Sequence, residues 1–183
     1  MLFSAHRKNG LIASDILFKA AIGIALVSFL ALAGAWAFEI LGGYVPCPLC
    51  LEQRIPYYAA VPAGALAAFL ARKTPLLSAI VLALITAALI YNAGLGVYHA
   101  GAEWHFWPGP DTCSSTQDIS ELTSGNLSKS LQHNRPVRCD EAALRIFGVS
   151  LAGYSVLISS ALALAGLWAL GRSKFWRSGK QGG

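Results

Sequence analysis

Charged residues divide the chain into long apolar stretches. The uncharged gaps hold 19 residues between Lys19 and Glu39, 17 between Arg54 and Arg72, 29 between Lys73 and Glu103, and 26 between Arg145 and Arg172. A helix needs about 20 apolar residues to cross the hydrocarbon core of a membrane, with a range of roughly 17–25. The pattern therefore predicts four membrane-spanning helices, at about 17–41, 56–71, 75–98 and 147–170.

Composition agrees with this reading. Hydrophobic residues make up 55% of the 183 residues and charged residues 13%, whereas a soluble domain carries about 25% charged residues. The mean hydropathy is +0.54. We predict an all-α integral membrane four-helix bundle forming one domain over residues 1–183, with outer loops at 42–55 and 99–146. In a soluble protein the net charge of +5 would suggest nucleic acid, but here we expect no nucleic-acid partner.

The distribution of charge predicts the orientation, because cytoplasmic loops are enriched in lysine and arginine. One side holds nine basic residues: Arg7, Lys8, Lys19, Arg72, Lys73, Arg172, Lys174, Arg177 and Lys180. The other side holds five: Arg54, Lys129, Arg135, Arg138 and Arg145. Both termini should therefore face the cytoplasm, with the two longer loops on the outer side.

All four cysteines fall on this outer side: Cys47, Cys50, Cys113 and Cys139. An even count in an oxidising compartment suggests disulfides, although the sequence leaves three pairings open. Cys47 and Cys50 form a CxxC motif just before the second span. The positive end of that helix and the charge of Arg54 would both stabilise a thiolate at Cys50, so the motif is a candidate redox centre.

Each of these interpretations of the cysteines and of Arg54 has a simpler alternative. The CxxC could be an inert disulfide or half of a zinc site, but zinc prefers four ligands and no second close pair of ligands follows, so we expect no metal. Arg54 also fits an interfacial arginine that reaches the lipid headgroups. Cys113 and Cys139 could form a static staple worth about 2–4 kcal/mol.

The third predicted span ends in an aromatic cluster. Tyr98, Trp104, Phe106 and Trp107 are typical of the belt that anchors a helix at the membrane interface. His99 lies at the same level, where it could donate a hydrogen bond to a ligand or carry a proton, or could be an interface residue without a chemical task.

Two sequence strings together resemble the bacterial disulfide bond formation protein B (DsbB) family. They are Cys47-Pro-Leu-Cys50-Leu-Glu-Gln-Arg54-Ile-Pro56-Tyr57 and the stretch from Gly96-Val-Tyr-His99 through Trp107-Pro-Gly-Pro-Asp-Thr-Cys113. The resemblance covers about residues 16–172. It implies a thiol:quinone oxidoreductase of the bacterial inner membrane, with ubiquinone or menaquinone as cofactor and its active loops in the periplasm.

The resemblance also implies how the cysteines work. A reduced DsbA-like oxidase, which has a thioredoxin-like fold, would attack a Cys113–Cys139 disulfide at Cys113. The freed Cys139 would attack Cys47 and leave Cys50 as a thiolate beside the quinone. Arg54 would hold that thiolate and a quinone oxygen, and His99 is a further candidate for quinone binding.

Two other classes of protein share parts of this pattern. Vitamin K epoxide reductase-like enzymes also combine a four-helix bundle, a quinone and a CxxC, but their loop cysteines precede the CxxC, whereas here they follow it. A structural membrane protein with two static disulfides is the non-enzymatic alternative, and the cysteine order does not exclude it.

Overall fold

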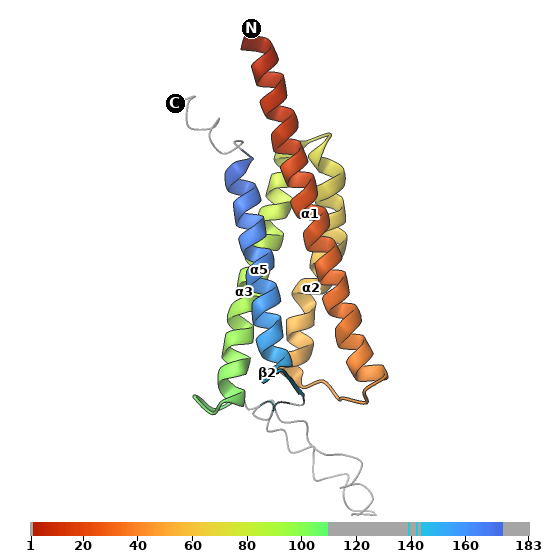
Figure 1. The fold of residues 1–183 in the computed structure, drawn as a ribbon, viewed down its shortest axis with the longest axis vertical. Helices are drawn as coiled ribbons and strands as arrows, with labels where there is room; N and C mark the ends of the chain where they lie inside the picture. The colour runs from red at the N-terminus through yellow and green to blue at the C-terminus, as the bar shows by residue number, and fades with distance from the viewer. Residues whose placement is uncertain (1, 110–138, 140–141, 143, 174–183) are drawn as a thin grey trace, which may run out of the picture.

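Four long helices form an elongated bundle in the computed structural model (Figure 1), which describes residues 2–109, 139, 142 and 144–173, with side chains from residue 12 onward. The helices are α1 (Leu2–Ile40), α2 (Pro48–Ala71), α3 (Pro75–Glu103) and α5 (Leu151–Arg172). Two short antiparallel strands, β1 (Arg145–Ile146) and β2 (Val149–Ser150), come directly before α5. The all-helical architecture that the sequence predicts is therefore present among the described residues.

The helices pack in chain order, with α1 against α2, α2 against α3, and α3 against α5. The beginning of α1 and the end of α5 lie at the same end of the bundle (Figure 1). The α1–α2 connection and β2 lie at the opposite end. The CxxC begins α2, so it lies at this second end, where α3 finishes and α5 begins.

The start of α2 corrects the sequence prediction. We expected residues 42–55 to form a loop and the helix to begin near residue 56, but α2 begins at Pro48. Cys47 is the N-cap residue, and its side chain accepts a hydrogen bond from the backbone N–H of Cys50 at 3.1 Å. Proline suits the first helical position because its fixed φ is already helical and its missing N–H would be unpaired there. Cys50 therefore lies in the first turn of a helix and not in a loop.

The other predicted helix ends also shift. α1 begins at Leu2 and not near residue 17, and α3 continues to Glu103 and not to residue 98. α5 begins at Leu151, after Ser150 caps it by accepting from the N–H of Gly153 at 3.2 Å. Charged side chains mark where a helix meets water, but they do not end it. The prediction therefore placed His99 at the start of a loop, whereas it lies within α3.

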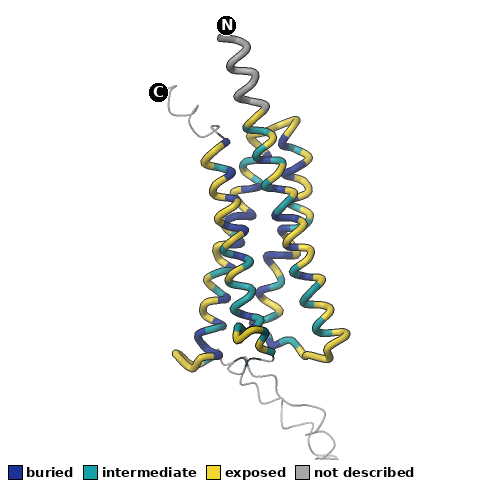
Figure 2. The backbone as a smooth tube through the Cα atoms, in the orientation of Figure 1, coloured by how far each residue is buried: buried dark blue, intermediate teal, exposed yellow. Residues whose placement is uncertain are grey.

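Close helix packing depends on small residues in the interior. A Cβ at Gly64 of α2 would lie 2.9 Å from the carbonyl oxygen of Ala21 in α1. A Cβ at Gly166 of α5 would collide with the side chain of Thr86 in α3. Figure 2 shows buried positions facing the bundle interior and exposed positions facing outward. Small residues let helix backbones approach in this way when lipid surrounds the bundle.

Many large apolar side chains point away from the bundle, including Leu30, Phe69 and Leu84. Three segments of the described chain are long and apolar enough to cross a membrane: Ile12–Ile40, Pro75–Glu103 and Leu151–Arg172. α2 does not meet the same measure among the described residues, so its predicted crossing stays a prediction. Its 24 residues would reach about 36 Å at 1.5 Å per residue.

Candidate redox site

Cys47 and Cys50 lie together at the beginning of α2. Both are free thiols, with their sulfur atoms 2.6 Å apart. Cys47 is 4% exposed, and Cys50 is partly buried. A hydrogen bond from the Cys47 thiol holds the pKa of Cys50 below its usual value, and the charge of Arg54 acts in the same direction. The same hydrogen bond, together with burial, raises the pKa of Cys47. Cys50 is therefore the better thiolate of the pair.

Cys139 packs directly against the CxxC. It is 1% exposed and forms a buried cluster with Cys47 and Leu49, against which Cys50 also packs. Cys139 is disulfide-bonded. Cys113, the remaining predicted site residue, lies outside the described residues. The fold thus brings three of the four predicted cysteines together, with Cys47 in the same cluster as Cys139.

His99 reaches the CxxC from the last turns of α3. Its Nε2 atom lies 3.6 Å from the sulfur of Cys47, and its Nδ1 atom lies 2.7 Å from the side-chain nitrogen of Gln53. Glu103 lies one turn further along α3, with a carboxylate oxygen 3.8 Å from the same Nε2 atom. All three polar side chains are buried. His99 therefore contacts a redox sulfur and is held in position from its other side by Gln53.

Arg54 lies one turn after Cys50 and is held by α1. Its guanidinium donates to Glu39 at 2.7 Å and to the backbone carbonyl of Ala35 at 3.5 Å. The guanidinium carbon also lies 5.5 Å from the centre of the Trp36 ring. These three partners come from about one helical turn of α1. Arginine carries five N–H donors, so this arrangement leaves donors for a further ligand.

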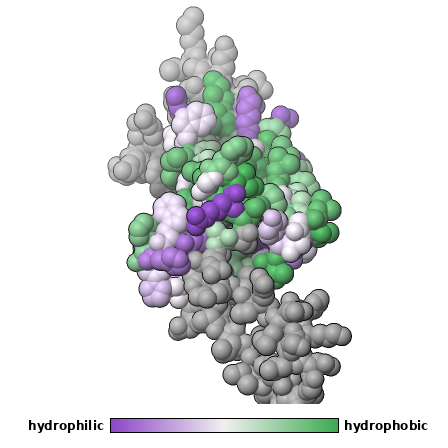
Figure 3. Space-filling view, turned by 60° about the horizontal axis from the view of Figure 1, so that its bottom comes forward, coloured by the Kyte–Doolittle hydropathy of each residue, from purple (hydrophilic) through white to green (hydrophobic). Residues whose placement is uncertain are grey.

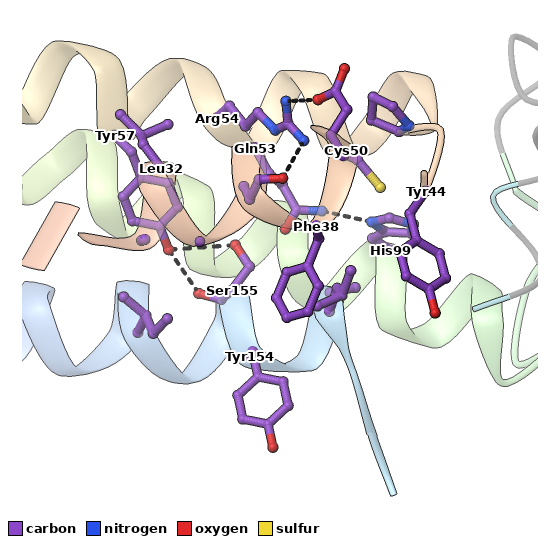
Figure 4. A pocket seen from close by; sticks show the side chains of 18 of the residues that line it. Leu32, Phe38, Tyr44, Cys50, Gln53, Arg54, Tyr57, His99, Tyr154 and Ser155 are labelled. Atoms are coloured by element: carbon purple, nitrogen blue, oxygen red, sulfur yellow. Dashed lines mark hydrogen bonds and ion pairs between the residues drawn. The ribbon is translucent and has the colours of Figure 1, made fainter. Parts of the chain in front are cut away.

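A cavity of about 470 Å³ opens beside these residues. Its walls come from α1, α2, the α1–α2 connection, His99 of α3, β1 and the beginning of α5. Most of the lining is apolar, and Figure 4 shows Cys50, Gln53, Arg54 and His99 along one side of the cavity, with the Phe38 ring next to them. Ligand pockets for small molecules have about this volume and this mixture of apolar walls and a few polar groups. The cavity could therefore hold a small, largely apolar molecule with a few polar atoms.

The polar groups of the site lie near the end of an otherwise apolar bundle. Figure 3 shows hydrophilic side chains at the end that carries the CxxC and again at the far end, with apolar surface between them. The aromatic residues predicted for the interface, Trp104, Phe106 and Trp107, are exposed there. The Trp107 ring stacks on Tyr98, with the ring centres 6.1 Å apart. This placement agrees with interfacial anchoring, where Trp and Tyr are favoured.

Sequence reasoning missed Glu39 and Gln53. Glu39 lies at the end of a long apolar stretch, where a charged residue is costly unless it is paired. That cost could have indicated an ion pair with Arg54, which is a basic residue on the same predicted side of the membrane. Gln53 gave no comparable signal, because its contact with His99 joins residues 46 positions apart. Only the packing of α2 against α3 brings these two side chains together.

Comparison with known proteins settles the family. Residues 19–169 match the family described as "Disulfide bond formation protein DsbB". The chain belongs to the DsbB family. It is therefore a membrane oxidoreductase of disulfide bond formation.

A similar curated protein is "Uncharacterized protein RP370" of Rickettsia prowazekii (strain Madrid E). It is 29% identical over 139 residues, which cover 75% of this chain and 78% of that protein. No solved structure is significantly similar to the chain.

Proposed function

We propose that this protein reoxidises a DsbA-like periplasmic thiol oxidase and passes the electrons to a membrane quinone, either ubiquinone or menaquinone. The observation that carries the proposal is the placement of the CxxC. Cys47 packs against the disulfide-bonded Cys139, while Cys50 lines the cavity. This arrangement supports exchange of Cys47 with a second disulfide and reaction of Cys50 with a small oxidant.

The thiol–disulfide exchange steps need no oxidant besides the disulfides of the protein itself. A thiolate of the reduced partner attacks Cys113 of a Cys113–Cys139 disulfide, and the partner's second thiolate resolves the mixed disulfide. The partner leaves oxidised, and Cys113 and Cys139 are left reduced. Cys139 then attacks Cys47 of an oxidised CxxC and releases Cys50 as a thiolate. Each attack forms one sulfur–sulfur bond and breaks one, as thiol–disulfide exchange requires.

The second half of the reaction, which is electron transfer from the CxxC to the quinone, takes place at the cavity. A bound quinone supplies a two-electron, two-proton acceptor. Cys50 presents its thiolate to the cavity, and Arg54 offers guanidinium donors to an oxygen there, while Glu39 keeps the guanidinium at the wall. His99 lines the cavity and also contacts Cys47, so it can carry a thiol proton toward the cavity. Attack of Cys113 on Cys139 of the Cys47–Cys139 bridge then restores the Cys113–Cys139 disulfide and releases Cys47 as a thiolate. Cys47 and Cys50 then close the CxxC disulfide, and their two electrons leave with the acceptor.

The proposal places the protein in the bacterial inner membrane with the CxxC end facing the periplasm. Three observations support this orientation: the bias of basic residues toward the other side, the common end for the start of α1 and the end of α5, and the presence of a disulfide at Cys139. Disulfides persist in the periplasm and are rare in the cytosol.

Alkylation trapping tests the relay against a structural protein with static disulfides. Membranes containing the protein are supplied with a reduced DsbA-like donor while the quinone pool is kept reduced, and free thiols are then labelled. The relay predicts that the CxxC becomes labelled, and that Cys139→Ser prevents this labelling. Cysteines that stay oxidised in the parent protein would contradict the relay and favour static disulfides.

A further inference from the structure

Three potential metal ligands converge at the beginning of α2. The sulfur atoms of Cys47 and Cys50 and a ring nitrogen of His99 all lie within 4.8 Å of one another. In the sequence no close pair of ligands accompanies the CxxC, but the fold brings in His99 from 52 positions beyond Cys47. Bond lengths of about 2.3 Å to sulfur and 2.0–2.1 Å to nitrogen place these two ligand atoms about 3.6 Å apart in a tetrahedral zinc site. The observed distance from Cys47 to His99 is 3.6 Å.

Glu103 offers a fourth ligand that the redox relay does not use. It is 6% exposed, with one carboxylate oxygen 3.8 Å from the Nε2 atom of His99. Its other oxygen is buried and has no hydrogen-bond partner among the residues that the structure describes, which is costly for a carboxylate. A divalent cation between the carboxylate and the sulfurs would give the carboxylate the partner that it lacks.

We propose that Cys47, Cys50, His99 and Glu103 bind Zn²⁺ when the CxxC is reduced, and that the metal holds the enzyme in an inactive dithiolate state. Binding releases the two thiol protons to solvent and transfers no electrons. The two sulfurs, now 2.6 Å apart, must separate by about 1 Å to bind one zinc ion. A disulfide between the same cysteines removes both thiolates, so the oxidised enzyme has no such site.

Gln53 completes the proposed site from behind the ring. Metal-bound histidines usually donate their other ring N–H to an oxygen, which fixes the orientation of the ring. The Gln53 amide lies 2.7 Å from Nδ1 of His99, and by turning over it presents its carbonyl oxygen to that N–H. Gln53 is 4% exposed, so its amide has little access to competing water.

Cobalt binding tests the site directly, without a donor protein or a quinone. The protein carries Cys113→Ser and Cys139→Ser, so that the CxxC provides the only thiols, and it is reduced and freed of reductant under anaerobic conditions. One equivalent of Co²⁺ should give sulfur-to-metal charge-transfer absorption and the strong visible bands of a tetrahedral ion, and one equivalent of Zn²⁺ should abolish them. Reduced protein without these bands, or oxidised protein that shows them, would overturn the proposal.

Two substitutions separate this site from a CxxC that binds metal alone. His99→Gln and Glu103→Gln each keep a side chain of similar size, and each should weaken Zn²⁺ binding at least about tenfold, since even outer-sphere partners of a metal site are worth 10–100-fold. His105→Asn is the matched control, because His105 is exposed and its φ of 60° is one that asparagine tolerates. Equal affinities in the parent and the His99→Gln variant would overturn the proposed ligand set.

The inhibitory effect rests on the proposed function and is measured separately. Enzyme reduced in advance and then given Zn²⁺ should begin quinone reduction only after a lag, and a chelator should remove the lag. Oxidised enzyme given the same Zn²⁺ should start without one. If the parent protein reduces quinone but shows no lag, zinc inhibition is wrong. If the parent reduces no quinone at all, the proposed function fails, while the cobalt measurement still decides the metal site.

Discussion

Replacement of Arg54 by glutamine should weaken the use of quinone without unfolding the protein. Arg54 lines the cavity, and its guanidinium is fixed by Glu39 at 2.7 Å and by the Ala35 carbonyl at 3.5 Å. Its side chain is 12% exposed and that of Glu39 is 29% exposed. A guanidinium held in this way is already oriented when a ligand arrives, so little conformational entropy is lost on binding.

The size of the effect follows from the hydrogen bond that is lost. A hydrogen bond from a charged donor contributes about 1.5–3 kcal/mol, and 1.4 kcal/mol corresponds to a tenfold change in affinity. The KM for quinone should therefore rise about 10- to 100-fold in Arg54→Gln. The loss of the ion pair with Glu39 should lower the free energy of unfolding by about 1–3 kcal/mol, because the Glu39 carboxylate is left without its partner.

The assay is quinone reduction by protein in lipid nanodiscs, with quinone varied at a saturating concentration of reduced donor. Arg72→Gln is the control, since Arg72 lies over Phe18 at 4.8 Å, at the other end of α2. The double variant Arg54→Gln/Glu39→Gln separates a lost ligand contact from the harm done by an unpaired carboxylate. A KM for quinone within twofold of the parent in Arg54→Gln, or full recovery in the double variant, would refute the proposed contact.

Two further predictions concern the scaffold around the site. Gly64→Ala places a Cβ 2.9 Å from the backbone oxygen of Ala21 and should lower the free energy of unfolding by about 1–3 kcal/mol. Thermal unfolding in detergent checks this against Gly94→Ala, where no atom of the described part of the chain lies within 4 Å of the added Cβ. Equal melting temperatures would contradict the prediction. Tyr57→Phe removes a hydrogen bond of 2.7 Å to Ser159 and should cost about 1 kcal/mol with little change in the KM for quinone. A large rise in that KM would mean that the Tyr57 hydroxyl acts on the ligand.

The spans were predictable because charged residues are scarce and well separated. Uncharged runs identified the cores of α1, α3 and α5, because the hydrocarbon core of a membrane excludes charged side chains. The helix ends were not predictable from charge alone, because Cys47 and Pro48 begin α2 by capping geometry and by a fixed φ. A proline just before an apolar run is a recognised signal for the start of a helix. Pro48 lies inside the CxxC, so it was interpreted as part of that motif.

The site was predictable in its residues but not in its geometry. The cysteines and Arg54 follow from motif and charge, and the fold places Cys50 and Arg54 on the same cavity wall. The approach of His99 to Cys47 depends on how α3 packs against α2, and a single sequence does not encode the distance between two helices in readable form. For the same reason the sequence argued against a metal site, whereas the zinc site that we propose depends on the approach of His99 to the CxxC.

The measurement closest to the central claim is quinone reduction by the purified protein with a reduced thioredoxin-like dithiol donor. We expect one quinol for each donor disulfide formed, since both are two-electron couples. Separate replacement of Cys47, Cys50, Cys113 or Cys139 by alanine should abolish turnover. Absence of quinone reduction by the parent protein, or unchanged turnover in Cys139→Ala, would contradict electron transfer through both cysteine pairs.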